Sequence, residues 1–161
     1  DLTSSSAATF INATNATLEV KGEIGSNVTL TATAAGNTVK YNGTTPQTIK
    51  PTSYVNPVAD NAVGLSTSSG TTTITGVLTL NNGVINTSAS NLLKLTNSAS
   101  VSGGSNSSYI NGPVTKVGNT DFIFPTGNNG KWMRVGVSGV IAASSTAAIS
   151  RRARFAATSA W

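Results

Sequence analysis

Apolar residues recur at every second position in short runs along this chain. Val28, Leu30 and Ala32 alternate with threonines. The same spacing returns in further runs, at Leu18 and Val20, Val39 and Tyr41, Leu78 and Leu80, Leu93 and Leu95, Phe122 and Phe124, and Val135 and Val137. A period of two over four to eight residues indicates half-buried β-strands. Before about residue 140 no stretch has the spacing of an amphipathic helix, so the pattern predicts an all-β fold.

Turn-forming residues separate these runs, among them Gly36-Asn37, Asn42-Gly43 and Asn111-Gly112. Asn and Gly supply the positive φ angles that tight turns need. The first strands are expected to begin near residues 18, 28 and 39. Such even spacing is typical of a sandwich, a barrel or a β-solenoid.

Two features favour the β-solenoid, in which parallel strands coil and stack along one axis. The inward positions hold mainly Val, Leu, Ile and Ala, which fit a narrow interior, whereas a sandwich core usually contains more aromatic residues. Asn and Thr are abundant at turns and on outward faces, where stacked coils allow like residues to form hydrogen-bonded ladders. The predicted fold is therefore a β-solenoid resembling a parallel β-helix, with a β-sandwich as the alternative.

The chain is predicted to divide after residue 117. Residues 1–117 are expected to form solenoid-like strand repeats, with an irregular start over 1–36 and the clearest repeats over 37–117. Residues 118–161 are more aromatic at first and are expected to form a β cap or the start of a second, sandwich-like β domain. The tail, 142–161, is rich in Ala and basic residues and matches no strand pattern.

Composition excludes most catalytic chemistry. The chain has 161 residues with no Cys and no His, so thiolate metal sites and the commonest general base are missing. Its carboxylates are Asp1, Glu19, Glu23, Asp60 and Asp121. Glu19 and Glu23, placed on one strand face, would lie about 13 Å apart, too far for a glycosidase pair. We expect no enzyme activity, no cofactor and no metal.

The charge of the chain does not indicate a nucleic-acid partner. The net charge is +5, but the basic residues are scattered apart from one cluster, Arg151, Arg152 and Arg154. Isolated lysines commonly keep strand edges soluble. No apolar run of 18 residues occurs, so no membrane-spanning helix is expected. The first residues lack the features of a signal peptide, and we expect the chain to be part of a larger chain or assembly.

Two threonine runs are the candidate ligand contacts: Thr29, Thr31 and Thr33, and Thr71, Thr73 and Thr75. Regular outward ranks of Thr on a flat face can order water as ice does. The alternative is that Thr is simply a preferred outward strand residue. A second candidate is an aromatic sugar-stacking platform, unless these residues fill the core instead. It would draw on Tyr41, Tyr54, Tyr109, Trp132 and Trp161.

Four segments follow one another in an order that resembles very large repetitive surface proteins of Bacteroidota. The first, residues 36–49, reads GNTVKYNGTTPQTI. It is followed by residues 73–85, 100–114 and 122–127. The resemblance covers roughly residues 36–139. It implies an extracellular protein of the bacterial cell surface, exported by type IX secretion.

The resemblance also implies a function, that of a structural or adhesive segment of a large surface protein or filament. Partners would be surface glycans or other copies of the chain, and the family offers no catalytic residues to carry over. Two alternatives remain open. One is a module that binds glycan or ice on the same scaffold, and the other is a fragment of a polysaccharide-active enzyme.

Overall fold

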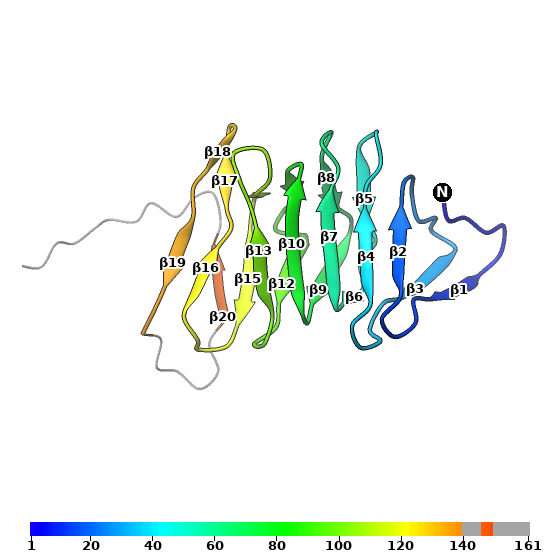
Figure 1. Ribbon diagram of the computed structural model, residues 1–161, viewed down its shortest axis with the longest axis horizontal. Helices are drawn as coiled ribbons and strands as arrows, with labels where there is room; N and C mark the ends of the chain where they lie inside the picture. Colours follow the sequence, from blue (N-terminus) through cyan, green and yellow to red (C-terminus); the bar gives the residue numbers. More distant parts are fainter. Residues whose placement is uncertain (140–145, 150–161) are drawn as a thin grey trace, which may run out of the picture.

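The computed structural model describes residues 1–139 and 146–149 and confirms the predicted β-solenoid. Every regular element in these residues is a strand. About five coils stack along the long axis of the molecule, from the N-terminal coil to the C-terminal cap (Figure 1). Register pairs Leu18 with Val39 of the next coil, so one coil takes roughly 20 residues.

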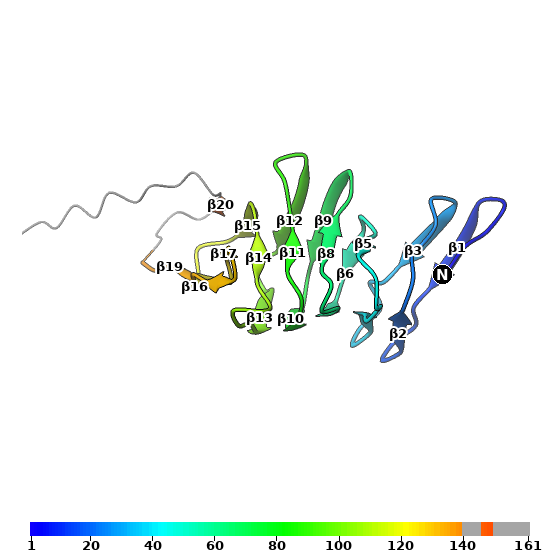
Figure 2. The same cartoon turned by 90° about the horizontal axis from the view of Figure 1, so that it is seen from above.

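Three sheets run along the stack (Figures 1 and 2). Sheet 1 contains β2 (Thr17–Val20), β4 (Thr38–Tyr41), β7 (Asn56–Asp60), β10 (Val77–Asn82) and β13 (Ser100–Gly103). Sheet 2 contains β5 (Gln47–Ile49), β8 (Leu65–Thr67), β11 (Ile85–Asn86) and β14 (Ile110–Asn111). Sheet 3 contains β6 (Ser53–Tyr54), β9 (Gly70–Ile74), β12 (Asn91–Leu95), β15 (Val114–Val117) and β20 (Thr146–Ile149).

The N-terminal end is less regular. There β1 (Ala8–Ile11) pairs in parallel with β3 (Val28–Thr31). A bridge between Ala32 and Tyr54 links β3 to sheet 3, and a bridge between Leu2 and Ile24 adds a short parallel contact. The coil before β4 therefore has paired strands in two of its positions and only an isolated bridge in the third.

The core consists of columns of inward side chains in register. One column of sheet 1 runs through Leu18, Val39, Pro57, Leu78 and Val101, because parallel strands pair the same inward positions in each coil. A column of sheet 3 runs through Tyr54, Ile74 and Leu95 to Lys116. Within these columns Ile74 and Leu95 are fully buried.

Asparagine ladders join neighbouring coils, although their chemistry differs from the expectation that amides would bond one another. Asn37 Nδ2 donates to the main-chain oxygen of Asn12 at 2.9 Å, and Asn56 Nδ2 donates to that of Asn37 at 3.1 Å. Amides do meet at two places, from Asn111 Nδ2 to Asn86 Oδ1 at 2.8 Å and from Asn61 Nδ2 to Gln47 Oε1 at 2.9 Å. Most of the ladder therefore satisfies backbone carbonyls at the corners, which would otherwise be buried without a partner.

Short antiparallel pairs close the C-terminal end. In the cap, β16 (Phe122–Phe124) pairs with β19 (Val135–Val137), and β17 (Gly127–Asn128) pairs with β18 (Lys131–Trp132). Phe124 is fully buried against the last coil. Lys116, buried at the end of its column, places Nζ 5.4 Å from the ring centroid of Phe122.

The side-chain pattern predicted no strand in the tail, and this prediction was wrong for four residues. Thr146–Ile149 form β20, which pairs antiparallel with β15. Backbone pairing with an available edge does not require an apolar alternation, which explains why the side-chain pattern missed it. Residues 140–145 and 150–161 lie outside the described residues. Nowhere in the described chain is there a helix able to cross a membrane.

Candidate functional site

The two threonine runs lie on the same side of the solenoid. Thr29 and Thr31 belong to β3, Thr71 and Thr73 belong to β9, and their side chains are exposed or half-buried. Thr33 and Thr75 follow these strands and are exposed. Ser53 of β6 pairs with Thr73, so a hydroxyl side chain occupies the coil between the two runs.

The row through Thr31, Ser53 and Thr73 ends after three coils, whereas Thr29 pairs with Thr9 of β1. Thr73 pairs with Lys94 and Thr71 pairs with Leu92 of β12. On the other side Thr31 pairs with Ile11, which is 66% exposed. The Thr75 hydroxyl also forms a hydrogen bond within the fold: its Oγ1 donates to the main-chain oxygen of Tyr54 at 3.0 Å. These breaks leave a short hydroxyl surface instead of a long regular array.

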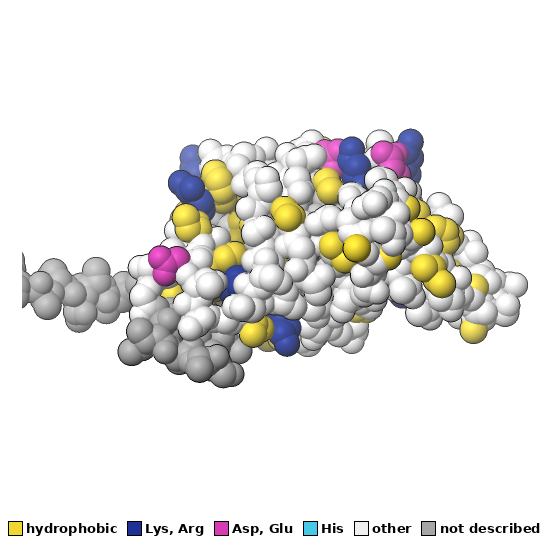
Figure 3. Space-filling model, turned by 60° about the horizontal axis from the view of Figure 1, so that its bottom comes forward, with side chains coloured by type: hydrophobic (Ala, Val, Ile, Leu, Met, Phe, Trp, Pro, Cys, Tyr) yellow, Lys and Arg dark blue, Asp and Glu magenta, His cyan; other side chains and the backbone are white. Residues whose placement is uncertain are grey.

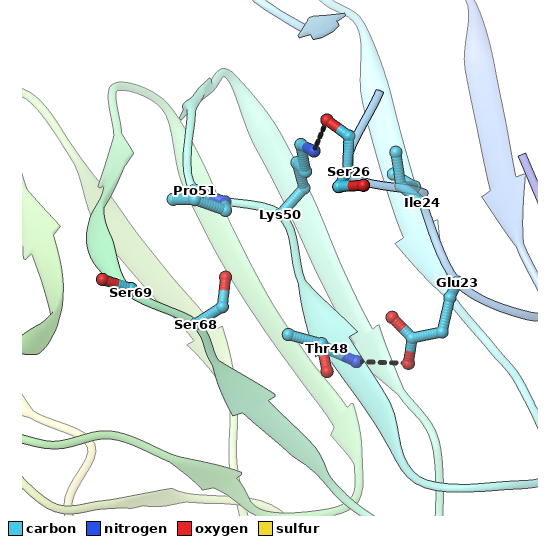
Figure 4. Close-up of a pocket in the computed structure, with 8 residues that line it drawn as sticks. All are labelled: Glu23, Ile24, Ser26, Thr48, Lys50, Pro51, Ser68 and Ser69. Atoms are coloured by element: carbon cyan, nitrogen blue, oxygen red, sulfur yellow. Dashed lines mark hydrogen bonds between the residues drawn. The ribbon is translucent and has the colours of Figure 1, made fainter. Parts of the chain in front are cut away.

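A groove opens where the coil containing β3 separates from the coil containing β5 and β6 (Figure 4). Its volume is about 410 Å³, within the range of small-molecule sites. The lining is mixed: Glu23, Ile24, Ser26, Thr48, Lys50, Pro51, Ser68 and Ser69. β5 is the edge strand of sheet 2. On its open side the groove is therefore lined by side chains and not by a further strand.

Two charged side chains cross the groove and hold its walls together. Glu23 Oε1 accepts a hydrogen bond from the Thr48 amide at 2.8 Å. Lys50 Nζ donates to the main-chain oxygens of Gly25 at 2.9 Å and Ser26 at 3.4 Å (Figure 4). Each side chain thus replaces part of a missing backbone ladder. The groups left to meet a ligand are mainly hydroxyls and the apolar surfaces of Ile24 and Pro51.

Sequence reasoning missed this groove because its charged residues lie far apart in the chain. Glu23 was expected on one strand face with Glu19, which was wrong: β2 ends at Val20, so Glu23 lies beyond it. Gly22 lies between the strand and Glu23, where the chain turns. Only a register between coils, which the sequence pattern does not fix, brings Glu23 beside Thr48.

The aromatic residues form no sugar-stacking platform in the described structure. Tyr41, Tyr54 and Tyr109 are buried. Trp132 is half-buried, and the Arg134 guanidinium lies 4.6 Å from the centroid of its ring. Trp161 lies outside the described residues.

Charged groups outside the groove show no metal-binding or paired-carboxylate arrangement. Lys40 Nζ lies 2.7 Å from Asp60 Oδ2 on the outer face of sheet 1. This hydrogen bond, with the charge of Asp60, raises the pKa of Lys40. In the part of the chain that the structure describes, no three His, Cys, Asp or Glu side chains gather to hold a metal.

Comparison with known proteins identifies no relative: no family model, no curated protein and no solved structure matches this chain. The fold nevertheless defines a class, that of the parallel β-solenoids. Within that class the function has to follow from this chain's own geometry, because a shared fold carries many functions.

Proposed function

We propose that this chain is a structural and adhesive segment of a large extracellular surface protein or filament. The observation that supports this proposal best is the continuity of the stack. The inward column from Leu18 to Val101 has one member in every strand of sheet 1. A stack of coils in which each contacts mainly its neighbours is an elongated spacer that displays its sides.

The surface chemistry supports an extracellular setting. Only 9% of the residues are charged, and no Cys is present. Hydrogen-bonded ladders such as that of Asn12, Asn37 and Asn56 stabilise the fold without covalent cross-links. Together with the resemblance to type IX secreted Bacteroidota proteins, these features suggest surface glycans or other copies of the chain as partners.

An adhesion assay under flow tests this role. Beads coated with the chain are passed over surfaces that carry glycans or the chain itself, with an unrelated β-protein of equal net charge as control. We expect the coated beads to be retained more strongly than the control beads on at least one of these surfaces. Equal retention on all of them would contradict the adhesive role.

Glycan binding in the groove between the coils is the second candidate function. Its support is the set of hydroxyls and apolar surface at Ser68, Ser69 and Pro51. We expect a Ser69→Trp variant to lose glycan-array binding because the indole fills the groove. Ser90→Trp, an exposed position in the next coil, serves as the matched control and should retain binding. Equal binding by both variants would exclude the groove.

The remaining alternatives have less support. Ice binding would need longer threonine rows, but Ile11 and Lys94 bound the row through Thr31 and Thr73, and Leu92 ends the row through Thr71. An enzyme fragment acting on polysaccharide would need two carboxylates facing one substrate. Glu19 and Glu23 lie on different parts of the coil, and Glu23 is bonded to Thr48.

A further inference from the structure

The strand β13 is the C-terminal edge of sheet 1. Among the described residues its one strand neighbour is β10. The Ser100 amide donates to the Gly76 oxygen at 2.9 Å, and the Gly104 amide donates to the Leu80 oxygen at 3.0 Å. Because backbone groups of alternate residues point to opposite sides of a strand, the amides and carbonyls of Val101 and Gly103 point away from β10.

The core columns of sheet 1 also end at this edge. Val101 continues the column of Leu78 but is only half-buried. Gly103, which pairs with Leu80, is exposed. The other two sheets extend further. In sheet 3, β20 covers β15, and beside sheet 2 the Ile110 amide donates to the Pro125 oxygen at 2.9 Å. The end of the solenoid therefore lacks one strand, at the position beyond β13.

A groove of about 170 Å³ occupies part of this position. Val101 and Gly103 form one wall, and cap residues form the other: Ile123, Pro125, Trp132 and Arg134. Ile123 is 56% exposed, and Met133, also in the cap, is 52% exposed. Figure 3 shows basic and apolar side chains lying side by side at the cap end of the molecule. The groove thus combines backbone hydrogen-bonding groups, an apolar wall and a positive charge.

We propose that this edge binds an extended peptide segment of another polypeptide by β-strand addition to β13. Main-chain hydrogen bonds to Val101 and Gly103 supply affinity, and an apolar side chain of the peptide covers Val101. A carboxylate of the peptide, from an acidic residue or its C-terminus, pairs with Arg134. This inference goes beyond the proposed adhesive role and does not depend on it.

The geometry favours a single strand over a second copy stacked end to end. At the opposite end of the molecule β2 is also an edge, and β1 extends one strand further beside β3. Sheet 1 is therefore recessed at both ends, so β2 of one copy and β13 of another are not free to meet. One extended segment beside β13 requires no displacement of β20 or of residues 125 and 126, which extend the other two sheets.

A binding experiment with a synthetic peptide tests the proposal. The probe is a fluorescent peptide with the sequence of β10, VLTLNN, and a free C-terminal carboxylate, because β10 is the strand that β13 already accepts. We expect saturable binding by fluorescence anisotropy. N-methylation of alternate backbone amides should weaken binding roughly tenfold or more, since each lost hydrogen bond is part of the ladder. Equal affinity of both peptides would overturn strand addition.

Variants of the chain locate the site. Val101→Pro removes an amide that points away from β10, so we expect peptide binding to be lost while the thermal unfolding temperature stays near that of the parent. Ser102→Pro is the control, because its amide points towards β10 and its loss should lower the unfolding temperature clearly. Ile123→Asp alters only the opposite wall and should also abolish binding. Unchanged binding by both Val101→Pro and Ile123→Asp would overturn the site.

The source and charge of the occupant are tested separately. Arg134→Ala should weaken the free-carboxylate peptide roughly tenfold but leave a C-terminally amidated peptide unchanged. Equal loss for both peptides would contradict the assigned role of Arg134. Sedimentation of the chain alone should show no assembly that depends on Val101. Self-association abolished by Val101→Pro would instead identify a second copy as the occupant and contradict the proposal.

Discussion

The hydroxyl oxygens of Tyr41 and Tyr54 lie 2.8 Å apart inside the coil formed by β4, β5 and β6. Tyr41 comes from sheet 1 and Tyr54 from sheet 3, so this hydrogen bond crosses the interior of one coil. Tyr54 Oη donates to the Lys50 oxygen at 2.6 Å, and the Lys50 amide donates to Tyr41 Oη at 3.2 Å. The pair thereby satisfies both backbone groups of a residue between two strands.

Removing one hydroxyl of this pair should destabilise the fold. In a Tyr54→Phe variant the Lys50 oxygen loses its donor, and we expect the free energy of unfolding to fall by about 1–3 kcal/mol. Tyr109→Phe is a matched control at the cap end, where the hydroxyl accepts from the Gly130 amide. Denaturant unfolding of Tyr41→Phe, Tyr54→Phe and the double variant measures the coupling between the two tyrosines. Fully additive losses would contradict a direct bond.

The same pair predicts a loss of stability at high pH. Burial raises the pKa of Tyr41 to about 12 and also raises the pKa of Tyr54. In the unfolded chain tyrosine ionises near pH 10. Because the folded state disfavours tyrosinate, the stabilisation is complete below about pH 10 and is lost as pH rises through the folded pKa values. Unfolding followed by tyrosinate absorbance should show this loss, and the Tyr41→Phe/Tyr54→Phe double variant should lack it.

Lys116 should stabilise the C-terminal end even though its burial lowers the pKa of its ammonium. Its Nζ donates to the main-chain oxygens of Thr96 at 2.9 Å, Asn97 at 2.7 Å and Val117 at 3.0 Å. In a Lys116→Met variant these oxygens lose their donor, and we expect the free energy of unfolding to fall by about 1–3 kcal/mol.

The control for Lys116 is Lys94→Met, because Lys94 is exposed on the outer face of β12. Surface substitutions of this kind usually change stability by less than about 0.5 kcal/mol. Chemical denaturation of the two variants provides the comparison. A Lys116→Met protein as stable as the Lys94→Met protein would show that the three carbonyl contacts contribute nothing net.

Glu23 should act as a clamp between coils. A Glu23→Ala variant leaves the Thr48 amide without its acceptor, and we expect a loss of about 1–2 kcal/mol and faster amide exchange at Thr48. Glu23→Gln retains an oxygen acceptor and should lose less. Glu19→Ala, at an exposed position of β2, is the surface control. Unchanged exchange at Thr48 in Glu23→Ala would contradict the clamp.

The sequence predicted the solenoid because alternation and turn residues are local signals. Val39 and Leu93, for example, are inward residues of short strands, as their spacing indicates. Other features depend on contacts between coils. The alternation places Tyr41 inward with Val39, but not its hydrogen bond to Tyr54 across the coil. The inward position of Lys116 follows only from its pairing with Leu95.

The groove and the β13 edge could not be predicted for the same reason. Glu23 becomes part of a groove only because the coil before β4 lacks a full strand beside β5. Val101 is a routine inward residue by its sequence pattern. Its half-burial comes from the ending of sheet 1 one strand before its neighbours. Long-range register decides both features, and an alternating pattern does not encode it.

The most direct test of the stacked column is a distance measurement along one outward row of sheet 1. A single outward row contains Glu19, Lys40, Thr79 and Ser102. Because the chain has no native Cys, pairs of introduced cysteines can be spin-labelled uniquely. With Ser102 as the fixed label, moving its partner from Lys40 to Glu19 should lengthen the distance by about 4.8 Å, to about 19 Å between the Cα atoms. Distances that do not increase from Thr79 through Lys40 to Glu19 would contradict the stack.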